Sequence, residues 1–219
     1  DYDIFDKQSL IRPYNGAVVK AVDYEMSRGC IYSCNYCVET IIQKYYDFTD
    51  SSPKTGAIKN FKSYLRHKSA KKIFDELEYL NKVKNVELIR CQDTNFLTND
   101  RHVLSELSDL IDKSNLDIKI YIETRPEGIN EASIELLKKL KVDGVGMGIE
   151  LADAKFREDN LHRFANQEKT LNAFRLLKIN GIKRTAYNII GLPNQNEESI
   201  LKTIEFNKLL NPDNITVAF

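Results

Sequence analysis

The stretch VELIRCQDTNFLTND, residues 86–100, contains the unit that decides the fold. It opens with VELIRC (86–91), an apolar and β-branched run that predicts a short buried strand. Polar residues follow where the strand ends, and Asn99 or Asp100 can cap a helix predicted over 101–113. A strand, a polar loop and an amphipathic helix in this order make one βα unit.

The same unit recurs along most of the chain. The predicted strands are VVKAVDYEM (18–26), VELIRC (86–91), IKIYIE (118–123), GVGMGIE (144–150), RTAYNII (184–190) and ITVAF (215–219). Helical patterns lie between them at 70–83, 101–113, 130–140, 166–180 and 197–210. Six strands alternating with helices indicate a parallel sheet with right-handed crossovers, either open and doubly wound or curved into a barrel.

Polar side chains at the strand ends favour the barrel. Strand after strand ends in residues that a buried parallel sheet would not tolerate: Arg28, Gln92, Asp93, Glu123, Thr124, Arg125, Glu150 and Asn188. In a barrel these carboxyl ends converge on one mouth, where such folds perform their chemistry. The expected fold is therefore α/β, a partial (β/α)6 TIM-like barrel with parallel strands.

Composition narrows the functional classes. The chain has 219 residues with 32 basic and 32 acidic side chains, so no global field attracts it to nucleic acid or to an anionic membrane. We find no membrane-spanning apolar stretch and no secretory signal, and we expect a cytoplasmic location. The chain starts without Met and stops on a predicted strand. We expect a segment of a longer protein, with residues 1–19 a leader or linker from an upstream domain and 20–219 the core.

Three of the four cysteines lie in the run RGCIYSCNYC (28–37), directly after the first predicted strand. Three thiolates in a compact loop suit a soft metal or an iron-sulfur cluster. A structural zinc site normally has four ligands, and no Cys or His close in sequence supplies the fourth. Cys91, at the end of the next strand, is the candidate that keeps a zinc site open.

The spacing CxxxCxxC formed by Cys30, Cys34 and Cys37, with the aromatic Tyr36 before the last cysteine, resembles the signature of the radical S-adenosylmethionine (SAM) superfamily. The resemblance implies that these cysteines bind three irons of a 4Fe-4S cluster. The fourth iron then chelates SAM. Reduction of the cluster splits SAM into methionine and a 5'-deoxyadenosyl radical. The cofactors carry that chemistry, while the protein positions them and excludes water.

Further motifs resemble the family's SAM-binding segments on later strands. In GVGMGIE, Glu150 is implied to contact the ribose, and in FREDNLHR (156–163) Arg163, with Arg157 as competitor, is implied to meet the methionine carboxylate. NIIGLPNQ (188–195) resembles the adenine-binding motif, although Tyr187 and Asn194 stand where many members have Gly and Glu. The SAM contacts implied in all are Tyr36, Asp93, Glu123, Glu150, Arg163, Asn188, Ile189, Gly191 and Leu192.

The leader IRPYNGAVVKAVDYEMSRGC (11–30) and the block CQDTNFLTNDR (91–101) most resemble the cobalamin-dependent and methylthiotransferase-like branches. A cobalamin motif of DxHxxG type is not present. DRHVLS (100–105) comes close, but we interpret Asp100 as a helix cap. Cobalamin would therefore be bound by an upstream domain that precedes residue 1.

The resemblance implies methyl transfer, methylthio transfer or a radical rearrangement on a substrate that the sequence does not identify. It also implies an electron donor such as flavodoxin or ferredoxin. Two alternatives stay open at this point: a non-catalytic iron-sulfur electron carrier, and a zinc-binding scaffold that uses Cys91 as fourth ligand.

Overall fold

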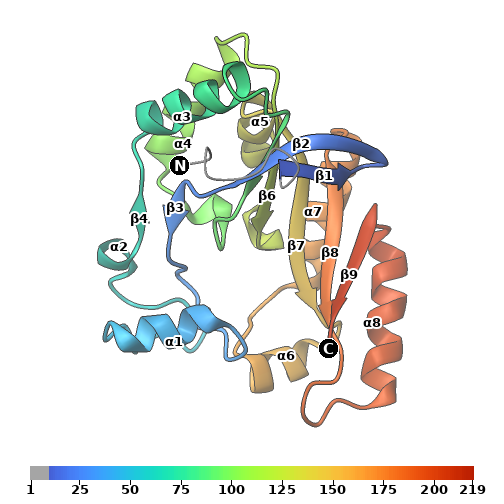
Figure 1. The fold of residues 1–219 in the computed structure, drawn as a ribbon. Helices are drawn as coiled ribbons and strands as arrows, with labels where there is room; N and C mark the ends of the chain where they lie inside the picture. Colours follow the sequence, from blue (N-terminus) through green and yellow to red (C-terminus); the bar gives the residue numbers. More distant parts are fainter. Residues whose placement is uncertain (1–9) are drawn as a thin grey trace.

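The computed structural model describes residues 10–219, which form a curved sheet with helices along its outer side (Figure 1). Within these residues six strands pair in parallel: β2 (Ala17–Tyr24), β5 (Leu88–Cys91), β6 (Lys119–Thr124), β7 (Val142–Glu150), β8 (Lys183–Ile189) and β9 (Asn214–Ala218). They lie in that order across the sheet. The six strands predicted from the sequence are all confirmed.

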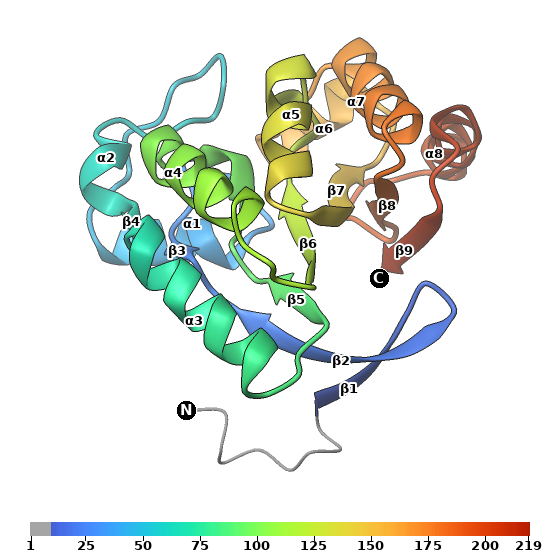
Figure 2. The same cartoon turned by 90° about the horizontal axis from the view of Figure 1, so that it is seen from above.

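Helices follow the strands and cover the outer face of the sheet. Seen from above, they form an arc around the curved strands (Figure 2). The arc consists of α3 (Ala70–Lys82), α4 (Arg101–Asp112), α5 (Glu131–Lys139), α7 (Gln167–Ile179) and α8 (Glu197–Leu210). Because the sheet curls without closing, the fold is a half-barrel, which confirms the expected partial TIM-like barrel.

The hydrophobic core lies between this arc and the sheet. Leu77, Leu107, Leu137 and Leu177, one from each of α3, α4, α5 and α7, are completely buried in it. Each helix presents its apolar stripe inward because leucines and isoleucines recur at helical spacing. The opposite face of the sheet is thereby left to line the interior of the half-barrel.

Helix boundaries follow local capping signals. Asp100 accepts hydrogen bonds from the backbone amides of His102, at 2.8 Å, and Val103, at 3.3 Å. This arrangement confirms the interpretation of Asp100 as the N-cap of α4. At the end of α7, Gly181 has a φ of 72° and its amide donates to the Lys178 carbonyl, which is a glycine-terminated C-cap.

One strand of the seven-stranded sheet was not predicted. β1 (Ile11–Tyr14) pairs antiparallel with β2 through a turn at Asn15 and Gly16, whose φ values of 51° and 79° suit an Asn-Gly hairpin. This hairpin joins part of the expected leader to the sheet. Residues 1–9 lie outside the described residues, and the boundary after residue 19 stays a prediction.

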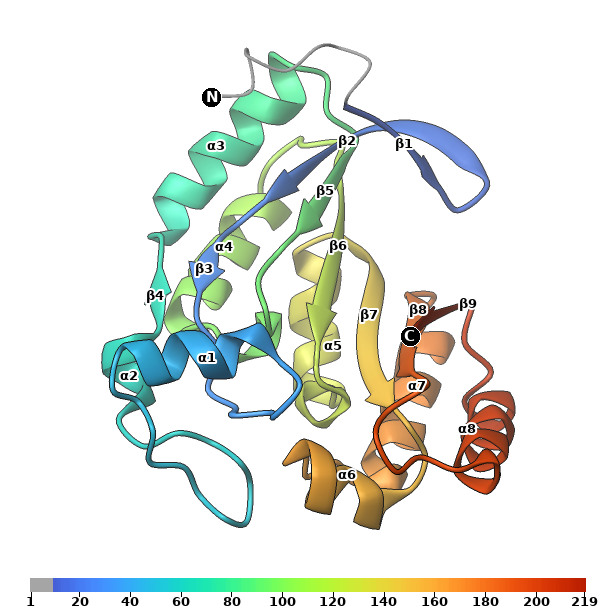
Figure 3. The same ribbon diagram turned by 60° about the horizontal axis from the view of Figure 1, so that its bottom comes forward.

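Shorter elements gather at the carboxyl ends of the strands. α1 (Val38–Tyr45) and α6 (Ala154–Leu161) lie below the strands in Figure 1, and Figure 3 shows α6 beyond the arrowhead of β7. The remaining short elements are α2 (Phe61–Tyr64), the pair β3 (Ser27–Arg28) and β4 (Arg66–His67), and the 3-10 turns η3 (Phe96–Thr98) and η4 (Pro126–Gly128). The sequence analysis did not predict α1, α2 or α6, although α1 has Val38, Ile41, Ile42 and Tyr45 at helical spacing.

A half-buried, hydrogen-bonded carboxylate, that of Glu76, connects α3 to β2. Glu76 accepts from Tyr24 at 2.5 Å and from Lys68 at 2.8 Å, and Lys72 lies 3.1 Å away. Burial alone would raise the pKa of Glu76, but these hydrogen bonds outweigh it and lower the pKa to about 2.

The Glu76 carboxylate makes the stability of the fold depend on pH in the acidic range. Because the folded pKa lies below the ordinary value of 4.5, Glu76 stabilises the fold above pH 4.5. That contribution is lost as the pH falls through about 2. We expect Glu76→Gln to flatten the fall in thermal midpoint across this range. Glu78→Gln, which removes only an exposed ion pair with Lys82, is the control and should follow the wild type.

Candidate functional site

The cysteine loop lies at the carboxyl end of the half-barrel, between β3 and α1. Cys30 and Cys34 are buried, Cys37 is half-buried, and none of the three forms a disulfide. Cys37 is also the N-cap residue of α1. All three thiols therefore stay available to a soft metal.

The polar face of α1 holds this loop in place. Gln43 donates to the carbonyls of Cys30, at 2.8 Å, and Tyr32, at 2.9 Å. Thr40 donates to the Cys34 carbonyl at 2.7 Å, and the amide of Cys30 donates to Glu39 at 3.1 Å. These polar side chains are buried because they satisfy the backbone of an irregular loop. The apolar side chains of the helix are turned to solvent instead.

Contacts from two other segments complete the support. The Ser33 amide donates to the Gly56 carbonyl at 2.9 Å, and the Asn35 amide donates to the Leu161 carbonyl of α6 at 3.0 Å. His162, directly after α6, lies 3.1 Å from the Ser33 hydroxyl. The loop is thus fixed from three sides before any cofactor binds.

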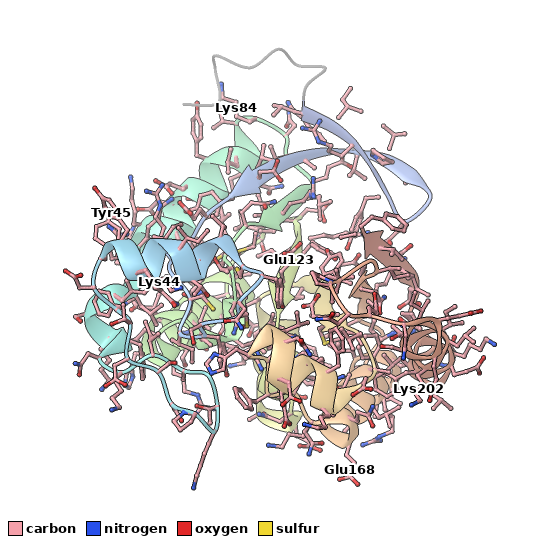
Figure 4. All side chains as sticks on the ribbon, turned by 90° about the horizontal axis from the view of Figure 1, so that it is seen from below. Lys44, Tyr45, Lys84, Glu123, Glu168 and Lys202 are labelled. Carbon is pink, nitrogen blue, oxygen red and sulfur yellow. The ribbon has the colours of Figure 1, made fainter. Side chains whose placement is uncertain are left out.

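The cysteines open into a pocket of about 170 Å³ inside the mouth of the half-barrel. The loop contributes one wall and the ends of β5 to β8 contribute the others. Figure 4, seen from below, places Glu123 at the centre of this opening. The pocket is lined by Cys30, Tyr32, Cys34, Tyr36, Cys37, Thr94, Asn95, Glu123, Thr124, Arg125, Gly146, Gly148, Glu150, Arg163 and Tyr187.

Burial favours the protonated thiol at Cys30 and at Cys37. Burial raises the pKa of Cys30 to about 12, and burial also raises the pKa of Cys37. A metal must displace these protons, since the thiolate is the ligand. Within residues 10–219 no three His, Cys, Asp or Glu side chains converge closely enough for a single metal ion. Three thiols in one loop can each ligate one iron of an iron-sulfur cluster.

Beside the thiols, Glu150 forms the centre of a polar contact group. Its carboxylate accepts from the Tyr36 hydroxyl at 2.8 Å, and the Arg163 Nε lies 3.7 Å away. Glu150 has a φ of 62°, and the pairing of β7 with β8 shifts register between Gly148 and Glu150. A non-glycine residue in this left-handed region is costly and typical of functional sites. The irregularity ends the strand and accompanies a carboxylate that lines the pocket.

Arg163 lines the pocket and is buried. Its terminal nitrogen donates to the Gly148 carbonyl, and its Nε makes the ion pair with Glu150 without a hydrogen bond among the described residues. A buried guanidinium that lines a pocket can pair with a carboxylate-bearing ligand. Arg157, its competitor in the sequence, donates to the carbonyls of Leu151, Ala152 and Ala165. Its Nε likewise has no hydrogen-bond partner among the described residues, but Arg157 does not line the pocket, and this separates it from Arg163.

Arg125 is a site residue that the sequence analysis did not assign. Its guanidinium stacks over the Tyr32 ring at 3.8 Å and lies 4.0 Å from the Cys34 sulfur. Glu127 holds it at 3.1 Å, and so does the Phe164 carbonyl at 3.2 Å. A sequence signal for Arg125 existed, because this residue follows β6 in the polar run that begins at Glu123. The sequence spacing did not show that Arg125 would lie next to the cysteine loop.

Other predicted residues lie elsewhere. Asp93 is buried behind the pocket, where it accepts hydrogen bonds from Met26, Ser27, Cys91 and Asn99. Asn188, whose side chain bonds Asn207 of α8, does not line the pocket, and the same holds for Ile189, Gly191 and Leu192. Their assignment as SAM contacts stays a prediction.

Cys91 also lies outside the pocket. Its thiol donates to Asp93 at 3.1 Å, and burial raises its pKa well above the ordinary value. The structure therefore does not bring Cys91 to the cysteine loop as the fourth ligand that a zinc site would need.

Comparison with known proteins gives the family. The family model of the Radical SAM superfamily matches residues 24–206. The chain belongs to this superfamily, whose members bind a 4Fe-4S cluster and SAM. It is a radical SAM enzyme domain.

The individual relatives are less than 30% identical to this chain in sequence. The chain is 28% identical over 189 residues to the anaerobic magnesium-protoporphyrin IX monomethyl ester cyclase of Rubrivivax gelatinosus, covering 85% of this chain and 30% of that protein. It is 25% identical over 191 residues to a putative methylthiotransferase of Methanocaldococcus jannaschii, covering 83% of this chain and 38% of that protein. The chain thus spans about a third of the length of these relatives.

Solved structures show the same fold. The radical SAM methyltransferase TsrM of Kitasatospora setae superposes with a TM-score of 0.72 at 16% identity, covering 91% of this chain and 35% of that one. Coproporphyrinogen III oxidase of Escherichia coli gives 0.63 at 19% identity, covering 90% and 43%. Among the described residues no helix is long and apolar enough to cross a membrane.

The hydrogen bonds of Asp93 generate a prediction about stability. Asp93→Ala should lower the free energy of unfolding by about 2 kcal/mol or more, because it leaves several buried donors without an acceptor. Urea denaturation measures the change. Asp109→Ala, which removes an ion pair with Lys139 whose partners are both half-exposed, is the control and should cost less than about 1 kcal/mol. Equal losses in the two variants would contradict a scaffold role for Asp93.

Proposed function

We propose that this chain is the catalytic core of a radical SAM enzyme that transfers a methyl or methylthio group, or rearranges a substrate bound inside the half-barrel. The observation that carries the proposal is the single pocket shared by three free cysteines and the group of Glu150, Tyr36 and Arg163. When bound, the reduced cluster supplies the electron that splits SAM and so starts radical chemistry.

The residues divide into two sets of roles. Cys30, Cys34 and Cys37 would hold three irons as thiolates. Glu150 would accept hydrogen bonds from ribose hydroxyls, since it already accepts one from Tyr36 on the pocket wall. Arg163, which lines the same pocket, would pair with the methionine carboxylate. Because Glu150 and Arg163 both lie beside the cysteines, they would hold SAM next to the cluster. The radical would then form only in the interior of the half-barrel.

Relatives support this range of reactions without selecting one. They include a cyclase, a putative methylthiotransferase and, at 24% identity, an uncharacterized methyltransferase of Pyrococcus horikoshii. One TsrM structure contains cobalamin with the 4Fe-4S cluster. We propose that any cobalamin used here is bound by a domain preceding this core, because a DxHxxG motif is not present in the chain.

The enzyme needs a one-electron reductant. We propose a low-potential donor such as flavodoxin or ferredoxin, and a cytoplasmic location, where a reducing environment preserves cysteine thiolates.

Electron paramagnetic resonance of the anaerobically reconstituted and reduced chain tests the function. We expect a 4Fe-4S signal that changes when SAM is added, because SAM binds the iron that lacks a cysteine ligand. Cys34→Ala is the matched control and should lose the signal while its circular dichroism stays native, since the core does not depend on the loop. A cluster signal that SAM does not change would contradict the proposal.

The role of Glu150 is tested separately. Glu150→Gln should retain the cluster spectrum and weaken SAM binding by about tenfold, because a charged acceptor is lost from the pocket. Isothermal titration of SAM into the reconstituted chain measures the dissociation constant. Glu168→Gln, an exposed change on α7 at the periphery of Figure 4, is the control. Unchanged SAM affinity in Glu150→Gln would remove this residue from the binding site.

A further inference from the structure

Arg125 lies beside the cysteine loop, but it has no role among the SAM contacts proposed above. It follows β6, lines the cysteine pocket and has a side chain that is only 10% exposed. Its Nη1 lies 4.0 Å from the Cys34 sulfur. A buried positive charge loses its hydration and needs partners within the protein, and here a thiol of the loop is one of them.

The other contacts of Arg125 fix its guanidinium in this orientation. Nη2 donates to Glu127 at 3.1 Å and to the Phe164 carbonyl at 3.2 Å, and Nε donates to the second Glu127 oxygen at 3.4 Å. The flat face of the group stacks on the Tyr32 ring at 3.8 Å. Nη1 is the nitrogen that these partners leave over, and it is the one that lies next to Cys34.

The carboxylate of Glu127 is the counter-charge of Arg125, and it lies on the other edge of the guanidinium. Glu127 contacts the Nε and Nη2 edge and does not line the cysteine pocket. Burial alone would raise the pKa of Glu127, but the charge and hydrogen bonds of Arg125 outweigh it and lower the pKa. The ion pair therefore has its positive end toward Cys34. Because Coulomb energy falls with distance, the nearer charge has the larger effect on the loop.

Other charged groups also face the cysteines. The Glu39 carboxylate accepts from the Cys30 amide at 3.1 Å, and Glu150 forms an ion pair with Arg163. Glu39 disfavours additional negative charge on the loop, and the charge of Arg163 is already matched by Glu150. Arg125 is thus placed to offset negative charge at Cys34.

We propose that Arg125 raises the reduction potential of the cluster that Cys30, Cys34 and Cys37 would bind. The proposal rests on the proposed function, because it needs that cluster. In the step concerned the electron donor loses one electron and the cluster gains it, while no bond breaks and the guanidinium keeps its proton. A fixed positive charge beside a cysteine ligand stabilises the reduced form, since net charge and hydrogen bonds to sulfur set the potential of such clusters.

A redox titration of the reconstituted chain without SAM, followed by electron paramagnetic resonance, tests this role. Arg125→Gln should lower the equilibrium constant for one-electron reduction by about tenfold or more, which corresponds to a potential lower by about 59 mV or more. Arg125→Lys keeps the charge and should recover most of this loss. Glu127→Gln should raise the potential, because it removes the counter-charge while Phe164 and Tyr32 still hold Arg125.

The control removes a positive charge from the surface. Arg66→Gln changes an exposed residue of β4 and should keep the wild-type potential, because solvent and salt screen its charge. Iron content and circular dichroism establish that each variant carries a full cluster and is folded. If Arg125 only supported the loop, its loss would lower the cluster content without changing the potential of the clusters that remain.

Three results would overturn the proposal: a wild-type potential in Arg125→Gln, an equal fall in Arg125→Lys, or no rise in Glu127→Gln. If Arg125→Gln holds no cluster, Glu127→Gln decides by itself. Weaker SAM binding with an unchanged potential in Arg125→Gln would make Arg125 a SAM ligand and would also reject the proposal.

SAM binding by the wild type separates this proposal from the proposed function. A wild-type chain that carries the cluster and fails to bind SAM rejects the proposed function, whereas the potentials of the variants can still be compared. A cluster that responds to SAM, together with potentials that do not follow the charge of Arg125 and Glu127, rejects only the role of Arg125.

Discussion

One face of the parallel sheet packs against helices, and the other face lines the interior of the half-barrel. The rest of the structure depends on this difference between the two faces. Along β7, Val145, Met147 and Ile149 are buried against the helices, while Gly144 and Gly146 lie beneath tyrosines on the inner face. Helices can supply hydrophobic burial on the outer face alone, because the inner face must leave space for ligands. The outer face of the sheet therefore carries the hydrophobic core, and the inner face lines the pocket.

The cysteine loop illustrates how an irregular segment can be held next to that hollow. Its backbone groups cannot pair within a sheet or helix, so they need other partners. Side chains of α1 supply several of them, and the carbonyls of Gly56 and Leu161 supply two more. Because α1 turns its polar face inward, Val38, Ile41 and Tyr45 remain exposed next to the loop. The local helix is thus arranged for the loop and not for the core.

The sequence by itself determined the strands, the main helices and the cysteine spacing, because each depends on residues close together in the chain. Alternating apolar residues, a cap such as Asp100 and the interval from Cys30 to Cys37 are all local signals. The resemblance of the cysteine run to the radical SAM signature also depended on residues close together in the sequence. The family match over residues 24–206 agrees with it.

Only the tertiary structure decided which polar strand ends share a pocket. Arg125 approaches Cys34 across 91 positions of sequence, whereas Asp93, which stood at an equally polar strand end, is used inside the scaffold. Because side chains alternate between the two faces of a strand, the sequence indicates the face on which a side chain lies. It does not indicate which residue that side chain contacts. The choice of Arg163 over Arg157 as the arginine of the pocket likewise depended on the turn after α6. Folding distributes similar polar residues between binding and support, because each must find hydrogen-bond partners that lie far away in the chain.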